Sequence, residues 1–488
     1  MLIFGIDVGT TGTKAAVVDE KGNVLAKGYQ EYSLITTPQG GVEQNAEDWW
    51  KATVFAVNTA MRKAGAKPEQ IAGISFSTQG GTTVATDENF TPLKSADTWM
   101  DRKAESEWEE LCRTIDPDEI YRKSGWQPNP AFDPAKIRYL HKNNPEIYQK
   151  TAYYLTTPEY ICQKMTGNAI IDPTNAAMRQ IFDINTGTWD DALTEFAQIK
   201  KNQLPEIRPT GVLAGNLTAK AAEQLGLKAE IPVFNGAHDQ YCAAIGSGAV
   251  NTGDLLLSTG TTWVVVGISD RPLFTENYLA PGMHPCKGKY GNIASLRSAG
   301  SALKWFKTLS KEEFAVMDKN AESRRESAKN LLYYPYYAGA GFPHNNDKLN
   351  SCILGMDLSN DAYDLALALM EGVAFETRLV LEEFDKTGNG IHALKMVGGA
   401  TNSELWSRLT CNVTEREIRP AKETDTCCIG ASMIAAVGLG IYEDYNAAVQ
   451  NMVQYSPAYN PEKEAAEFYE EKFARYKKGL ETLQQIYC

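Results

Sequence analysis

Two short segments rich in glycine and threonine carry the residue types that bind a phosphate group. They are Asp7-Val8-Gly9-Thr10-Thr11-Gly12-Thr13-Lys14 and Ser258-Thr259-Gly260-Thr261-Thr262. Glycines let backbone N–H groups approach an anion, and threonine hydroxyls add further donors. Lys14 can place a cation beside that anion, and Asp7 can hold Mg²⁺, which prefers one or two carboxylates together with phosphate oxygens. One such turn alone could be an ordinary hairpin, but its repetition favours a phosphate site, although neither copy has Walker A spacing.

An aspartate precedes the second of these segments by about twenty residues. Asp239 lies in Gly236-Ala237-His238-Asp239-Gln240, just after the apolar run Ile231–Phe234, so it is expected at the end of a strand. Transfer of a phosphoryl group to an alcohol needs a carboxylate that orients the attacking hydroxyl and accepts its proton. A lone aspartate in a loop is more often a helix cap or turn residue. Its place before the second phosphate segment makes Asp239 the best candidate base, with His238 supporting its loop.

The composition is that of a globular protein without a large basic surface. The 488 residues are 43% hydrophobic and 22% charged, and the formal net charge is -13. Proteins that bind nucleic acids need a basic face that displaces counterions, so the acidic balance and the lack of a Lys/Arg-rich run argue against that function. The nine cysteines have no metal-type spacing and are expected to be reduced thiols.

The sequence shows neither the pattern of a leader peptide nor that of a membrane span. It opens Met-Leu-Ile-Phe-Gly-Ile-Asp, without the basic and long apolar regions of a signal peptide. No stretch approaches the ~18 consecutive apolar residues that a transmembrane helix needs. We therefore expect a cytoplasmic protein without a membrane partner.

Hydrophobic patterning predicts the same strand–turn–strand unit twice, about half the chain apart. The elements expected in the first copy are strands at 2–7, 14–19 and 24–32, a helix at 46–64 capped by Asn45, and a strand at 71–78. The second copy has strands at 255–258 and 263–268. The repetition, and a length too great for one core, predict two related α/β domains that face each other across a cleft. The boundary is expected within Gly246–Asn251, giving domains 1–246 and 247–488.

The rest of the second half is expected to be mostly helical. Helices are predicted at 360–386, 404–413, 429–438 and 462–487, and a strand at 394–397. The strand leads into Gly398-Gly399, and the last helix is expected to cover the second domain.

In these segments and in their order, the chain resembles the FGGY carbohydrate kinases, a family that includes glycerol kinase, xylulokinase, gluconate kinase and ribulokinase. Residues 6–14 and 256–265 are similar to the two phosphate segments of the family, and Gly398–Trp406 is similar to its adenosine segment. Ser351–Gly372 fits the C-terminal signature of the family. Val42–Trp50 and the residues around Trp99 resemble segments of xylulokinases.

The resemblance implies two actin-like (ribonuclease H-like) domains that close on ATP and a sugar. It implies that Asp239 is the catalytic base and that Asp7 and Asp239 position Mg²⁺. The residues implied to bind ATP are Thr10, Thr11, Lys14, Gly260, Thr261, Gly300, Gly399 and Asn402. The residues expected to contact the sugar are Gln79, Trp99, Asp101, Asp239 and Gln240.

Departures from the family pattern bear on the substrate. Where glycerol kinases carry Arg-Glu to hold the short triol, this chain has Gly80-Gly81, and their glycerol-contacting Tyr aligns with Ala131. A pocket lined by these residues has more room and less charge, which favours a longer substrate. A ketose such as a pentulose, or a related polyol, is the leading expectation, although the His of the first xylulokinase site is absent.

Two other functions stay open at this point. A kinase of an aldonate such as gluconate would need a cation near its pocket, and Arg102 is the candidate. An actin-like or Hsp70-like ATPase without a sugar substrate would have similar phosphate hairpins. A homodimer is the oligomeric state left open.

Overall fold

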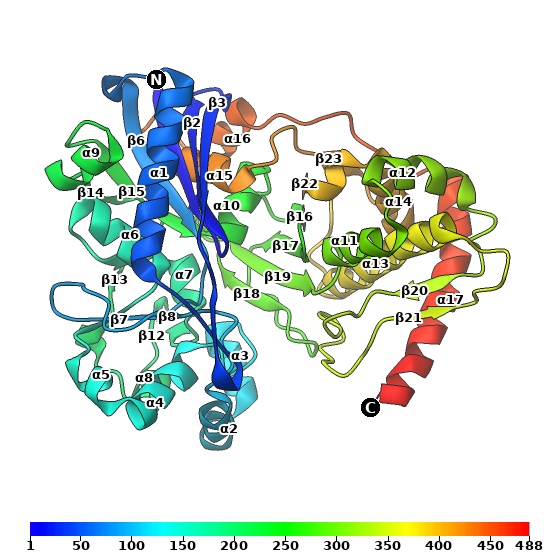
Figure 1. Ribbon diagram of the computed structural model, residues 1–488, viewed down its shortest axis with the longest axis horizontal. Helices are drawn as coiled ribbons and strands as arrows, with labels where there is room; N and C mark the ends of the chain where they lie inside the picture. Colours follow the sequence, from blue (N-terminus) through cyan, green and yellow to red (C-terminus); the bar gives the residue numbers. More distant parts are fainter. Residues whose placement is uncertain (488) are drawn as a thin grey trace.

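The computed structural model describes residues 1–487, which form two lobes that lie side by side (Figure 1). Each lobe is built on a six-stranded mixed sheet flanked by helices, as expected. The two sheets share no strand, and the chain passes from the first sheet to the second shortly before residue 255. The described part of the chain contains no helix both long and apolar enough to cross a membrane, and its eight cysteines are free thiols.

The first sheet has the strand order β14-β15-β6-β1-β2-β3. Its strands are β1 (Leu2–Val8), β2 (Gly12–Asp19), β3 (Val24–Glu31), β6 (Ile71–Thr78), β14 (Leu213–Asn216) and β15 (Pro232–His238). β2 begins two residues earlier than predicted, because its antiparallel ladder with β1 continues to the pair Val8↔Thr13 at the Gly/Thr turn. β1 pairs in parallel with β6, and β6 with β15, so the carboxyl ends of three strands meet at one edge.

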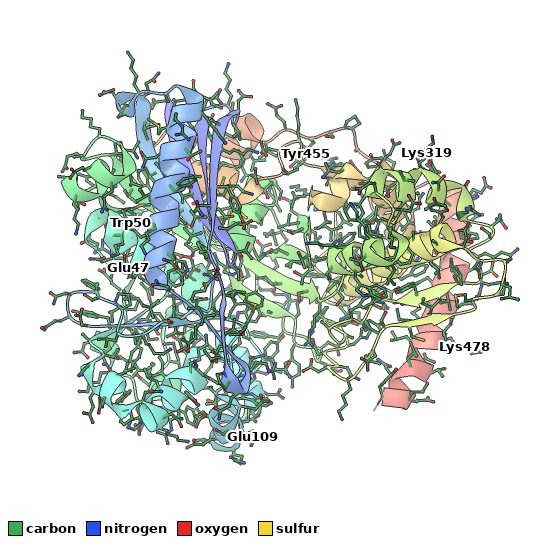
Figure 2. All side chains as sticks on the ribbon, in the orientation of Figure 1. Glu47, Trp50, Glu109, Lys319, Tyr455 and Lys478 are labelled. Carbon is green, nitrogen blue, oxygen red and sulfur yellow. The ribbon has the colours of Figure 1, made fainter. Side chains whose placement is uncertain are left out.

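One face of the first sheet is covered by α1 (Ala46–Ala64), as predicted. The Asn45 side chain caps this helix by accepting from the N–H of Glu47. Figure 2 shows Glu47 and Trp50 on α1; Trp50 Nε1 donates to Gln224 Oε1 (2.9 Å), and Glu47 Oε1 accepts from Tyr160 (2.6 Å). These bonds fasten α1 to α6 (Thr157–Thr166) and α9 (Ala219–Leu225).

An insertion between β6 and β14 extends the first lobe. It contains α2 (Glu105–Thr114), α3 (Pro117–Ser124), α4 (Asp133–Asn143), α5 (Pro145–Lys150), α7 (Pro173–Ala177) and α8 (Asp191–Ala197), which lie below the sheet in Figure 1. The carboxyl ends of β1, β6 and β15 point toward this insertion, so it forms one wall around the residues that follow those strands.

The second sheet has the order β18-β19-β17-β16-β22-β23. Its strands are β16 (Leu255–Thr259), β17 (Trp263–Ser269), β18 (Ala280–Met283), β19 (Tyr290–Leu296), β22 (Leu394–Gly398) and β23 (Ile418–Pro420). The helices of this lobe are α11 (Gly300–Ser310), α12 (Phe314–Ala321), α13 (Ala362–Lys386), α14 (Glu404–Thr414) and α17 (Lys463–Tyr487). As predicted, α17 covers the second domain, where it buries Tyr469, Phe473 and Tyr476 in the core.

Two helices lie between the sheets and join them. α10 (Asp239–Gly246) crosses α15 (Thr426–Gly438) so closely that a Cβ added at Gly430 would be 1.9 Å from the carbonyl oxygen of Cys242. α15 begins three residues before the predicted helix at 429, because Thr426 follows Asp425 directly into the first turn. α15 also packs against β1 and β6, although it follows the second sheet in sequence. One hydrophobic cluster therefore contains Ile3 of the first sheet, Ile434 of α15 and Leu256 of the second sheet.

Candidate active site

Asp7 lies near the end of β1, opposite Ser77 of the neighbouring parallel strand. Its Oδ1 accepts a hydrogen bond from Ser77 Oγ (2.8 Å). Burial and the nearby carboxylate of Asp239 raise the pKa of Asp7 to about 7, against the opposing effects of Ser77 and Lys14. Two carboxylates that repel each other in this way suit a bound cation, whose charge would remove the repulsion.

Asp239 is the first residue of α10 and directly follows β15, as predicted for a residue at the end of a strand. Its side chain is 25% exposed, and its Oδ1 lies 3.3 Å from Nε2 of His238. His238 is buried, and its backbone N–H donates to Thr174 Oγ1 (2.8 Å). The carboxylate thus lies beside a buried imidazole while part of its surface stays accessible.

Lys14 forms an ion pair with Asp425, which lies just before α15. Burial lowers the pKa of Lys14, but the hydrogen bond and charge of Asp425 raise it further, so the net pKa is above its ordinary value. Lys27 Nζ also lies 2.5 Å from the other carboxylate oxygen of Asp425. The predicted phosphate ligand Lys14 is therefore fully charged, and a phosphate group at this position would share it with Asp425.

The first Gly/Thr turn is hydrogen-bonded, directly or through Gln44, to two of the residues that are predicted to contact the sugar. Trp99, which is 47% exposed, donates from Nε1 to Thr10 Oγ1 (3.0 Å). Gln44 donates to the Thr10 carbonyl (2.6 Å) and accepts from Gln79 Nε2 (2.8 Å). The Oε1 atoms of Gln79 and Gln240 are buried without a partner in the described part of the chain. Each of these amide oxygens can therefore accept a hydrogen bond from a ligand.

The backbone after Gln79 is supported by a lysine that the sequence did not single out. Lys136 of α4 is buried, and its Nζ donates to the carbonyls of Gly81 (2.7 Å) and Asp97 (3.0 Å). Burial lowers the pKa of Lys136 to about 8, although nearby aspartates oppose the shift. Gly81 has φ +64°, a left-handed conformation that favours glycine. The bond from Lys136 to Gly81 thus restrains the Gln79–Gly81 segment.

Asp101 has a different setting from the other predicted sugar residues. Its side chain is fully buried, and its carboxylate accepts from the N–H groups of Val42 (2.9 Å) and Lys103 (3.1 Å). Asp101 lies beside Glu43 and Asp97 in a cluster that could hold a metal ion. The Lys103 ammonium lies 2.6 Å from both of these carboxylates, and Lys94 lies 2.6 Å from Asp97, so two cations balance the charges of Glu43 and Asp97. The geometry favours a role for Asp101 in holding its loop, and direct contact with a sugar stays a prediction.

The second Gly/Thr turn opens into a cavity of about 770 Å³ in the C-terminal lobe. Five of the predicted ATP residues line it, namely Gly260, Thr261, Gly300, Gly399 and Asn402. A Cβ at Gly300 would lie 2.2 Å from the carbonyl oxygen of Gly260, so these two segments touch through their backbones. A cavity of this size lined mainly by apolar groups with a few polar ones is typical of a cofactor site. The remaining predicted ATP residues, Thr10, Thr11 and Lys14, belong to the other lobe.

Sequence reasoning missed several residues of this cavity. They include Phe314, Ala315, Asp318 and Lys319 of α12. Burial raises the pKa of Asp318, while a hydrogen bond with Ser403 opposes the shift. No motif marks the residues of α12 as ligands, whereas Trp263, Ser403 and Trp406 lie in segments that the resemblance matched without singling these residues out. Ser77 was also not predicted as a site residue, and it faces Asp7 because β1 and β6 pair in parallel, a pairing that was not predicted from the sequence.

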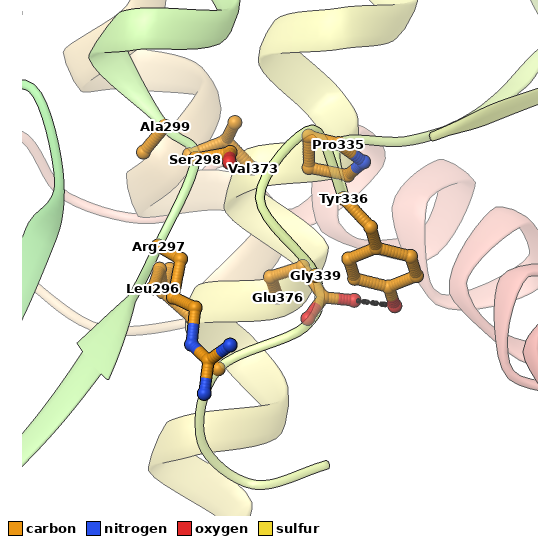
Figure 3. A pocket seen from close by; sticks show the side chains of 10 residues that line it. Leu296, Arg297, Ser298, Ala299, Pro335, Tyr336, Gly339, Val373 and Glu376 are labelled. Carbon is orange, nitrogen blue, oxygen red and sulfur yellow. Dashed lines mark hydrogen bonds between the residues drawn. The ribbon is translucent and has the colours of Figure 1, made fainter. Parts of the chain in front are cut away.

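A second, much smaller cavity in the C-terminal lobe is lined by side chains that already bind one another. It is lined by Arg297, Tyr336, Glu376 and their neighbours (Figure 3) and has a volume of only about 10 Å³. Tyr336 donates to Glu376 Oε1 (2.7 Å), the bond drawn in Figure 3, and His344 lies 3.1 Å from Glu376 Oε2. A space of this size holds about one water molecule, so it is no substrate site.

Comparison with known proteins places the chain among sugar kinases. Residues 2–246 match the FGGY family of carbohydrate kinases, N-terminal domain, and residues 255–439 match its C-terminal domain. The xylulose kinase of Bacillus subtilis is 25% identical over 478 residues, covering 97% of this chain and 96% of that protein. The glycerol kinase of Thermococcus gammatolerans is 28% identical, covering 90% of both chains. The crystal structure of gluconate kinase from Lactobacillus acidophilus superimposes with a TM-score of 0.92 at 26% identity, covering 100% of this chain and 99% of that one.

Fold, site and matches together define a phosphotransferase with an alcohol group as acceptor. The chain belongs to the FGGY family of carbohydrate kinases, which confirms the family and the two-domain actin-like fold expected from the sequence. Membership also sets aside an ATPase without a sugar substrate. The relatives act on different substrates by name, so the family does not identify the sugar.

Proposed function

We propose that this sugar kinase transfers the γ-phosphate of ATP to a hydroxyl of a ketose, with a pentulose favoured, or of a related polyol. The observation that carries the proposal is the setting of Asp239, a partly exposed carboxylate at the head of α10, close enough to Asp7 to raise its pKa. In this position Asp239 accepts the proton of the attacking hydroxyl.

The two Gly/Thr turns bind the phosphates of ATP in this proposal. Thr261, Gly300 and Gly399 hold the nucleotide in the C-terminal cavity, and Thr10, Thr11 and Lys14 meet its phosphates from the other lobe. Asp7 and Asp239 hold Mg²⁺, since their hard oxygen donors and mutual repulsion fit a small divalent cation. Bound there, the ion would neutralise phosphate charge.

The preference for a ketose rests on the two glycines that directly follow Gln79. Gly80 and Gly81 add no charge and no bulk, and Gly81 lies against Trp99, whose exposed ring suits the C–H face of a sugar. Gln79 and Gln240 each offer a free amide oxygen to a hydroxyl group. Gln79 and Gln240 thus offer groups that bind hydroxyls, whereas the nearby cation Lys136 is buried and already bonded to the carbonyls of Gly81 and Asp97.

The aldonate alternative depends on Arg102. Its side chain is 49% exposed and lies 3.6 Å from Glu105, a neighbouring carboxylate that already balances its charge. This geometry favours a neutral substrate over gluconate.

A substrate panel tests the proposal. ADP release is measured with ketopentoses, ketohexoses, polyols, glycerol and gluconate, each as a function of concentration. We expect the highest kcat/KM with a ketose or polyol of five carbons or more. The highest kcat/KM with gluconate would overturn the substrate assignment in favour of the aldonate alternative.

The role of Asp239 is tested with Asp239→Asn, which keeps the shape of the side chain but removes its basicity. We expect kcat to fall by about 10²–10⁴-fold, while binding of metal-free ATP, followed by quenching of tryptophan fluorescence, stays near wild type. The indoles of Trp263 and Trp406 line the nucleotide cavity and provide that signal. Turnover within a few-fold of wild type would show that Asp239 is not the base.

A further inference from the structure

We propose that His238 is a positioning residue that orients the carboxylate of Asp239 and ties that orientation to the sugar-binding segment Gln79–Gly81. The inference rests on the proposed function of Asp239 as the base. It assigns to His238 a role in the rate of transfer, beyond the loop support expected from the sequence.

The first argument is the contact between the two side chains. His238 Nε2 lies 3.3 Å from Asp239 Oδ1, and the imidazole is only 7% exposed. Nδ1 of His238 is buried without a partner in the described part of the chain. An unpartnered acceptor costs less than an unpartnered N–H, so the stable neutral tautomer carries its proton on Nε2, the nitrogen that lies 3.3 Å from Asp239 Oδ1. The imidazole therefore presents its polar edge to one carboxylate oxygen, and the other is left for the substrate hydroxyl.

The second argument is the contact of the imidazole with the backbone of the sugar-binding segment. A Cβ added at Gly80 would lie 2.6 Å from Cδ2 of His238 and 2.7 Å from Cγ of Met178. The backbone of Gly80 has no positive φ, so glycine is needed here for space and not for conformation. The ring of His238 occupies the volume that any other residue at position 80 would fill.

The third argument is that the ring has a firm support behind it. Tyr241 of α10 stands edge-on to His238, with ring centroids 6.0 Å apart, and its hydroxyl donates to the carbonyl of Gly291 (3.0 Å) on β19. The ring of His238 is thus packed between Gly80 and Tyr241. A displacement of the Gln79–Gly81 segment is transmitted to the imidazole and from there to Asp239.

Two amide substitutions separate hydrogen bonding from packing. His238→Gln can place an N–H near the position of Nε2, whereas His238→Asn is one methylene too short to reach Asp239. We expect kcat to fall by about 10–100-fold in the Asn variant, as for a small misplacement of a catalytic group. The sugar KM should change less than about 3-fold, and the Gln variant should recover most of kcat. Equal kcat values for the two variants, or loss in KM alone, would overturn the proposal.

Gly80→Ala probes the same link from the sugar side. The added methyl must push His238 or Met178, so we expect a loss of kcat similar to that of His238→Asn. In the double variant Gly80→Ala/His238→Asn, the alanine should cost little more, because its effect acts through the ring that is already gone. If the fold-losses of kcat from the two single substitutions multiplied in the double variant, Gly80 and His238 would act independently, and the proposed coupling would be overturned.

The failure of this inference is distinguishable from the failure of the proposed function. An inactive Asp239→Asn beside a fully active His238→Asn would remove only the positioning role of His238. An active Asp239→Asn would remove the base assignment itself. Melting temperature and nucleotide binding are measured for every variant, and the Gln variant tests the contact even where a shorter side chain impairs folding.

Discussion

The carboxylate of Asp7 lies close enough to that of Asp239 to be repelled by it, and Lys14 offsets only part of this effect. Its pKa of about 7 results from burial first and from the charge of Asp239 second. The ordinary value for an unfolded chain is 3.8. Between these two values the folded protein binds a proton that the unfolded chain does not, so ionised Asp7 destabilises the fold as the pH rises.

We predict that Asp7→Asn raises the melting temperature of the metal-free protein at pH 8 but not at pH 4. The destabilisation by the ionised carboxylate is absent below about pH 4, grows as the pH rises toward 7 and is complete above it. The gain at pH 8 should be roughly 1–3 °C, measured by differential scanning fluorimetry with EDTA. A variant that melts below wild type at pH 8 would contradict the burial and repulsion that we describe.

A good part of the site was predictable at the level of single residues. Asp239 lies at the end of its strand, and the five expected residues of the second lobe do share a cavity. Asp101 was predicted as a sugar ligand because carboxylates accept from hydroxyl groups, and nothing in the sequence indicated its burial or the bond that it accepts from the N–H of Lys103. Lys136 and Asp425 gave no signal, since the partners of their side chains are at least 39 residues away in sequence.

At the scale of elements, the crossing of α10 and α15 depends on two glycines. A Cβ at Gly246 would lie 2.0 Å from the carbonyl oxygen of Thr426, and one at Gly430 would lie 1.9 Å from that of Cys242. Neither glycine has a positive φ, so both serve the close approach of the backbones. Since Asp239 is the first residue of α10, a shift of this crossing also shifts the base.

We predict that Gly430→Ala destabilises the protein by at least about 2 kcal/mol. Alanine favours a helix by about 1 kcal/mol over glycine, so a loss of stability would come from overpacking alone. The measurement is urea unfolding followed by circular dichroism. Lys478→Ala on the exposed face of α17, which Figure 2 marks, is the control and should change stability by less than about 0.5 kcal/mol. An unchanged midpoint for Gly430→Ala would refute the close crossing.

Elements with a strong period were predictable to within a few residues. The bounds of α1 and β6 agree with the sequence prediction, because each has a clear apolar pattern and a defined start. The Ala- and Gly-rich segment of α15 has no polar face, so its pattern indicated close packing but not the sheet on which it packs. Its place on β1 is a tertiary contact that no local pattern encodes.

At the scale of the whole molecule, the two lobes share part of their hydrophobic core although their sheets are separate. The hydrophobic cluster that contains Leu256 joins Ile3 and Val18 of the first sheet with Met433 and Ile434 of α15. A cut at the predicted boundary between 246 and 247 would expose this face of the first sheet. The boundary itself stays a prediction, as do the homodimer and the cytoplasmic location.

We predict that residues 1–246 expressed alone do not fold cooperatively. Without α15, the apolar face of β1 and β6 has no cover, so the fragment should bind the dye ANS and unfold without a sharp transition. Addition of residues 247–488 by co-expression should restore a single transition. A fragment that melts sharply without ANS binding would show that the first lobe has a complete core of its own.

The return of α15 to the first sheet also has a consequence for synthesis on the ribosome. The first sheet leaves the exit tunnel long before residues 426–438, which complete its packing, have been made. At about 5–20 residues per second, the nascent lobe waits on the order of 10–40 s with an uncovered apolar face. Exposed apolar surface of this kind is prone to aggregation, so the interval before α15 is made is when the nascent chain would need a chaperone.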